Sequence, residues 1–111
     1  MKNKDIAVLK KSADFAKIVE KHSVFNNVIF KIKATPNNLN KLRFGLAVNK
    51  KNFPTAVARN LIKRQMRQFI QQISNIKHVD MIVVVKSNYL NNKYETNKKF
   101  FNEVYNLVHF K

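Results

Sequence analysis

The spacing of hydrophobic residues predicts a short helix near the start of the chain. Phe15, Ile18 and Val19 recur at three- and four-residue intervals, which is the period of one helix face. Ser12, just ahead of them, is of a residue type that caps helix N-termini. We therefore expect an amphipathic helix over about residues 13–21.

The period then changes to two, which predicts two strands. Residues 28–34 place apolar side chains on one face and Lys31 and Lys33 on the other. The apolar face consists of Val28, Phe30, Ile32 and Ala34. Residues 42–48 alternate in the same way after the turn-forming segment 35–38. Because so short a turn separates them, the two strands are expected to pair antiparallel.

A long amphipathic helix is predicted to follow. Proline at position 54 ends the extended segment, and Thr55 can cap a helix that starts after it. On a helical wheel the apolar stripe consists of Ala58, Ile62, Met66, Phe69 and Ile73, and the far side of Asn60, Lys63, Arg64, Arg67 and Gln71. Arg59 lies at the border between the two.

The last third of the chain predicts one more strand and one more helix. Residues 81–85 form a continuous apolar run, typical of a strand covered on both faces, and the helix before it should make it parallel to the strand at 42–48. Apolar residues at helical spacing predict a final helix over about 97–110. The order α-β-β-(β)-α-β-α indicates an α+β protein, an α-β sandwich on a mixed sheet of three to four strands.

Composition and charge indicate that the protein binds nucleic acid. The chain has 111 residues, enough for a single domain over 1–111. It contains 22 Lys and Arg but only 6 Asp and Glu, which gives a formal net charge of +16. It has no Cys and one Gly, which excludes thiolate metal sites and glycine-rich phosphate loops. The acidic residues are scattered and the three histidines lack ligand spacing. We expect an RNA-binding domain without catalytic residues, metal or cofactor of its own.

Apolar segments are short throughout. None approaches the roughly 20 residues of a membrane span, and residues 6–9 are too few for the apolar core of a secretory signal. We expect no membrane association and a cytoplasmic protein. The lone acid at the entrance of the last strand, Asp80, is expected to be structural and to accept backbone hydrogen bonds.

The basic residues of the long predicted helix form a ladder. Arg59, Lys63 and Arg67 are spaced by four residues, about 6 Å per step, which is comparable with phosphate spacing along a nucleic-acid strand. Asn60 and Arg64 form an adjoining row. Solvated helix faces usually alternate in charge, but no acid occurs between residues 43 and 72. The pattern favours a surface that contacts a polyanion.

At these residues the sequence resembles the bacterial ribonuclease P protein subunit. The matching motifs are Arg43-x-Gly45-x-x-Val48-x-Lys50-Lys51, Ala56-x-x-Arg59-Asn60 and Lys63-Arg64-x-x-Arg67. Leu61 stands where the family has a second arginine, Asn49 where Ser is common, and Phe53-Pro54 in a turn that often carries Gly.

The resemblance implies a fold, partners and site residues. In the family a catalytic RNA subunit holds Mg²⁺ and cuts precursor tRNA at the 5′ end of the mature tRNA, while the protein binds that RNA and the 5′ leader. The residues implied to face RNA are Lys50, Lys51, Arg59, Asn60, Lys63, Arg64 and Arg67. The implied leader groove, between the sheet and the signature helix, is lined by Phe15, Val19, Phe30 or Ile32, with Lys63 and Arg67 at its edge. A left-handed β-α-β crossover is implied as well, against the usual right-handed rule.

Three alternatives remain at this stage. Composition alone permits another small basic RNA-binding protein, such as a ribosomal protein. A nuclease active without RNA is the second. The third is a DNA-binding helix, because a basic helix by itself does not specify RNA, although we expect no DNA partner. Among the aromatic residues, Phe15 is the best candidate to stack on a base, whereas Phe30 and Phe44 are at positions more typical of a core.

Overall fold

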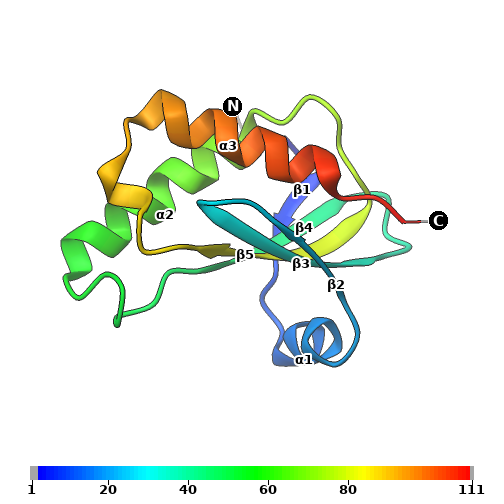
Figure 1. Cartoon of the computed structure of the whole chain (residues 1–111). Helices are drawn as coiled ribbons and strands as arrows, with labels where there is room; N and C mark the ends of the chain where they lie inside the picture. Colours follow the sequence, from blue (N-terminus) through cyan, green and yellow to red (C-terminus); the bar gives the residue numbers. More distant parts are fainter. Residues whose placement is uncertain (1–2, 111) are drawn as a thin grey trace.

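The structure, a computed structural model, describes residues 3–110. Within them the chain forms five strands, three helices and a short 3-10 turn (Figure 1). In order these are β1 (Ile6–Val8), α1 (Ser12–Glu20), β2 (Ser23–Asn26), β3 (Phe30–Pro36), β4 (Leu42–Ala47), α2 (Ala56–Gln71), β5 (Val79–Val85), η1 (Tyr89–Asn91) and α3 (Tyr94–Leu107). The predicted α+β class is confirmed, with five strands in place of the three to four expected.

The five strands form one mixed sheet in the order β1-β4-β5-β3-β2. β4 and β5 are parallel, as predicted, but β3 and β4 do not pair. Instead β5 lies between them and pairs antiparallel with β3. The predicted β3–β4 hairpin is therefore wrong. The reason is that β5 is apolar on both faces and takes the central position, whereas β3 carries lysines on one face and lies farther out.

Two strands escaped the sequence analysis because they are short. β1 has three residues and pairs parallel with β4, and β2 has four residues and pairs antiparallel with β3. So few residues cannot establish a period of two. Val28, expected in the apolar face of β3, precedes that strand and is 63% exposed. A turn closed by Asn27, whose side-chain oxygen accepts from the backbone N–H of Phe30, joins β2 to β3 instead.

The sheet is covered unequally on its two faces. α2 and α3 lie together on one face, and α1 lies alone on the other (Figure 1). The main core is between the sheet and the helix pair, where the ring of Phe101 contacts those of Phe30 and Phe69 at centroid distances of 5.9 and 6.1 Å. Ile62 and Met66 of the predicted α2 stripe are fully buried in it. The wheel position of α2 is therefore confirmed.

The connection from β4 through α2 to β5 is unusual in its handedness. In Figure 1, β4 runs toward the left, α2 returns above the sheet, and β5 again runs leftward on the nearer side of β4. This path turns in the left-handed sense. General packing rules favour the opposite sense in about 98% of such units, so the resemblance predicted this feature where the general rule would not.

The helix termini agree only in part with those predicted from the sequence. Thr55 is the N-cap of α2, and its hydroxyl accepts from the backbone N–H of Ala58 at 3.2 Å, as predicted. Ser12 is not a cap, because α1 begins at Ser12 itself and Lys11 precedes it without a side-chain hydrogen bond. α3 begins three residues earlier than expected and ends at Leu107. Within residues 3–110 no helix has the length and apolar character needed to cross a membrane.

Candidate nucleic-acid interface

The outer face of α2 carries the basic side chains that the sequence singled out. Asn60, Arg64 and Arg67 are exposed, and Lys63 is half-buried. Within residues 3–110 the ion pairs are those of Arg43 with two aspartates, so none of the α2 cations is neutralised by a carboxylate. Their charge is available to a polyanion.

Arg59 differs from the other members of the predicted ladder. Its Nη1 donates to the backbone carbonyls of Phe53 and Pro54 at 2.8 and 3.0 Å. The side chain is half-buried and is tied to the loop between β4 and α2. That loop carries the exposed Lys50 and Lys51, so Arg59 fixes where these two lysines lie relative to the helix.

The departures from the family motif in this loop have a structural explanation. The side-chain oxygen of Asn49 accepts from the backbone N–H of Asn52 at 2.8 Å, and the backbone carbonyl of Asn49 accepts from Phe53 at 3.0 Å. The Phe53 ring is buried in the main core. A polar turn residue and an apolar anchor therefore hold this turn without a glycine.

A second surface lies on the side of the sheet that α1 covers. We call it the α1 face and define it by Phe15 and Val19 of α1 and Lys31 and Lys33 of β3. Phe15 is half-buried, and Val19 is 66% exposed. Because Phe30 and Ile32 point into the main core, the alternation of β3 directs the two lysines to the opposite face. Both lysines are half-buried there.

Residues 3–110 form no open groove with the lining that the resemblance implied. Phe30 and Ile32 are 0% exposed, so neither can line an open groove. The space between the sheet and α2 is filled by the core, and α1, with Phe15 and Val19, lies on the other side of the sheet from α2 (Figure 1). The error is one of strand phase, since the residues of β3 that face α1 are its lysines.

Glycine at position 45 is explained by the approach of Phe15. A Cβ atom on Gly45 would lie 2.8 Å from Cε1 and 3.1 Å from Cζ of the Phe15 ring. The first distance is shorter than van der Waals contact between carbon atoms permits. The ring therefore rests directly on the backbone of β4, and its position depends on the absence of a side chain at residue 45.

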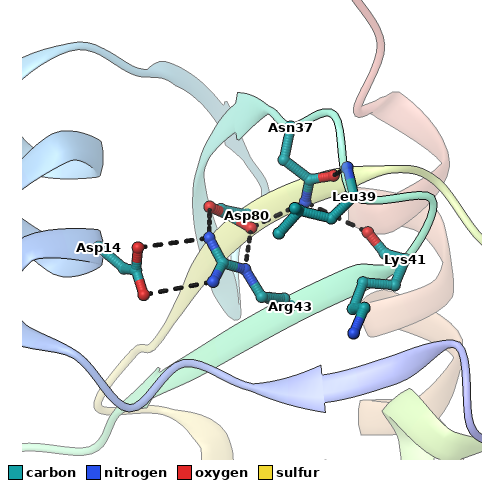
Figure 2. Close-up of polar contacts among 6 residues, drawn as sticks. All are labelled: Asp14, Asn37, Leu39, Lys41, Arg43 and Asp80. Carbon is teal, nitrogen blue, oxygen red and sulfur yellow. Dashed lines mark hydrogen bonds and ion pairs between the residues drawn. The ribbon is translucent and has the colours of Figure 1, made fainter.

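One ion-pair network connects α1 with the sheet (Figure 2). Arg43 of β4 donates from Nε to Oδ1 of Asp80 at 2.8 Å and from Nη2 to Oδ2 at 2.6 Å. Its Nη1 also donates to Oδ2 of Asp14 in α1 at 3.2 Å. Asn37 completes the network by donating from Nδ2 to Oδ1 of Asp80 at 2.8 Å. The hydrogen bond to Asp80 raises the pKa of the Arg43 guanidinium above its ordinary value, although desolvation opposes this.

Sequence reasoning identified Asp80 but not its partners. The aspartate is 1% exposed and accepts from two side chains, not from the backbone as we expected. A signal was present in the sequence, because Arg43 lies on the polar face of its strand in a chain with six acids. What the sequence could not show is the register, which pairs Arg43 with Asp80 across neighbouring strands.

The remaining titratable groups form no compact cluster. Within residues 3–110 no group of three or more His, Asp or Glu side chains is placed to hold a metal ion. His22 and His109 instead contact backbone carbonyls of Ile18 and Leu107 through Nδ1.

A small mixed α/β protein whose basic helix face lacks acidic partners is of the class that associates with nucleic acid. Comparison with known proteins makes this specific. The family model for ribonuclease P matches residues 3–108. The ribonuclease P protein component of Mesoplasma florum is 35% identical over 107 residues, covering 94% of each chain. That of Mycoplasma capricolum is 38% identical over 102 residues, covering 89% of this chain and 91% of the relative. The chain belongs to the ribonuclease P protein family.

Solved structures agree with this assignment. A Staphylococcus aureus RNase P protein, a mutant with defective mRNA degradation activity, superimposes with a TM-score of 0.83 at 28% identity, covering 90% of this chain and 86% of that one. The RNase P protein of Thermotoga maritima shares the fold, with a TM-score of 0.79 at 21% identity over 91% of this chain and 97% of that one. This chain is thus the protein component of a tRNA-processing ribonucleoprotein endoribonuclease, and the ribosomal-protein alternative is set aside.

Proposed function

We propose that this protein binds the catalytic RNA of ribonuclease P and the 5′ leader of precursor tRNA, and so assists 5′ maturation of tRNA in the cytoplasm. The observation that carries the proposal is the outer face of α2, where Lys63, Arg64 and Arg67 stand together without acidic partners. Arginine grips phosphate through two nitrogens, and lysine acts as a mobile point charge. Asn60 beside them can donate to or accept from a base or a 2′-hydroxyl.

The proposal assigns the bond-breaking chemistry to the RNA. Of the six acidic residues, Asp14 and Asp80 are occupied by Arg43, and no acidic cluster suited to a metal is found in residues 3–110. Two-metal hydrolysis of a phosphodiester needs several carboxylates or phosphates around Mg²⁺. We therefore place the Mg²⁺ ions on the RNA subunit, with no cofactor or catalytic residue in this chain.

We assign the leader to the α1 face. Phe15 offers a partly exposed ring on which a base can stack, and Lys31 and Lys33 supply charge for the backbone of a single strand. Val19 contributes apolar surface but no aromatic ring. Lysines and one aromatic residue favour contact with phosphates over recognition of base identity, so the leader site should tolerate different sequences.

Arg67→Ala should weaken binding to the catalytic RNA and make it less dependent on salt. Arg67 is exposed and has no carboxylate partner, so its loss removes about one phosphate contact and lowers the slope of log affinity against log salt by about one. Fluorescence titrations at several salt concentrations measure both quantities. An unchanged affinity and slope would show that this face of α2 is only solvated.

The experiment that tests the proposed function is reconstitution. Protein alone should not cleave precursor tRNA, whereas protein with the cognate catalytic RNA and Mg²⁺ should cut at the 5′ end of the mature tRNA. The protein should raise affinity for precursor more than for mature tRNA, because only the precursor carries a leader. Its effect should be largest at low salt and low Mg²⁺. Cleavage by protein alone, or an equal gain for both tRNAs, would contradict the proposal.

A further inference from the structure

α1 has few attachments to the rest of the protein. Ile18 is the one residue of this helix that is fully buried, while Phe15 is half-buried and Val19 is mostly exposed. Its N-terminus lacks a side-chain cap. A nine-residue helix is too short to be stable by itself in water, so its place on the sheet depends on these few contacts.

Arg43 supplies the polar attachment. Asp80 is almost completely buried and holds the guanidinium through two hydrogen bonds, which fixes the direction of the arginine fork. The remaining nitrogen, Nη1, donates to Oδ2 of Asp14 at 3.2 Å, and Nη2, which also bonds Asp80, donates to Oδ1 of Asp14 at 3.5 Å (Figure 2). The Arg43 guanidinium, itself fixed by Asp80, therefore holds the first turn of α1 at a fixed distance from the sheet and in a fixed rotation about the helix axis.

Phe15 is the residue next to Asp14. Its ring already lies against the backbone of Gly45, where there is no space for a Cβ atom. The strand register places Gly45 and Lys33 in one row across the sheet, on either side of Ile82. Any shift of the first turn of α1 therefore moves the Phe15 ring across β4 and changes its position relative to Lys33. The ion pair and the glycine contact fix the same short stretch of α1 from two sides.

We propose that Arg43 and Asp14 are positioning residues for the α1 face. The pair keeps the first turn of α1 in place so that Phe15 and Lys33 contact the same single-stranded RNA leader. This inference rests on the proposed assignment of the leader to that face. The ion pair between Arg43 and Asp14 contributes little to the folding of the domain, because the Asp14 side chain is 23% exposed and the pair is partly solvated.

The test uses the holoenzyme reconstituted with cognate catalytic RNA. Asp14→Ala should reduce the preference for precursor over mature tRNA about fivefold, the lower end of the range for coupled sites. Affinity for mature tRNA should stay the same, and the melting temperature of the free protein should fall by no more than about 5 °C. Asp14→Glu keeps the charge and should retain most of the preference.

Glu20→Ala is the matched control. Glu20 is exposed at the other end of α1 and forms no ion pair within residues 3–110, so its removal changes the net charge equally without touching the attachment. It should leave the preference unchanged. Full preference in Asp14→Ala, or an equal loss in Glu20→Ala, would overturn the inference. A wild-type enzyme without any preference for precursor would instead overturn the proposed function, and the inference with it.

Discussion

Arg43→Met should lower the free energy of unfolding by roughly 3–5 kcal/mol, the range for breaking one side of a buried ion pair. The substitution leaves Asp80 1% exposed with its charge opposed only by the amide of Asn37. Methionine fills a comparable volume, so the loss reflects the uncompensated carboxylate and not a cavity. Denaturant titration followed by circular dichroism measures the change.

The double variant Arg43→Met with Asp80→Asn separates charge from packing. Removing both charges should recover most of the lost stability, because a buried ion pair replaced as a unit costs little. The asparagine carbonyl can still accept from Asn37. If the double variant were as unstable as the single one, the network would matter through packing, and our electrostatic explanation would be wrong.

Phe69→Ala should lower the free energy of unfolding by a similar amount, about 3–5 kcal/mol. Its ring is 1% exposed and lies 5.0 Å from the ring of Tyr94 and 6.1 Å from that of Phe101, so it joins α2 to α3. Ile62→Ala, on the same buried stripe, should cost about 2–5 kcal/mol. A small domain is stable by only about 5–15 kcal/mol, so either change is a large fraction of the whole.

Arg64→Ala is the control on the same helix. Arg64 is exposed on the opposite side of α2, and its removal should change folding by less than about 0.5 kcal/mol while still weakening RNA binding. Thermal melts of the three variants rank the effects. If Arg64→Ala were the most damaging, the orientation of α2 described above would be wrong.

Sequence alone determined the features that depend on neighbouring residues. The buried stripe of α2, its cap at Thr55 and the basic outer face all follow from spacings of three or four positions. The parallel pairing of β4 with β5 follows from the helix that connects them. The motif from Arg43 to Arg67 was enough to identify the family, because its residue types and spacing survive the change at Leu61.

Tertiary structure decided what depends on distant segments. Placing β5 between β3 and β4 joins residues 37 to 55 positions apart, and no local period encodes it. That placement brings Asp80 beside Arg43, and the packing of α1 on this face of the sheet brings Asp14 to the same guanidinium.

The tertiary structure also determined which face of β3 points into the main core. Alternation along β3 shows that its lysines oppose its apolar residues, but only the positions of α1 and the helix pair show which side is the core. Most of the buried apolar residues belong to the main core on the α2–α3 side, so Phe30 and Ile32 turn toward it and Lys31 and Lys33 turn toward α1. Local patterns record which residues share a face, whereas long-range packing determines what that face meets.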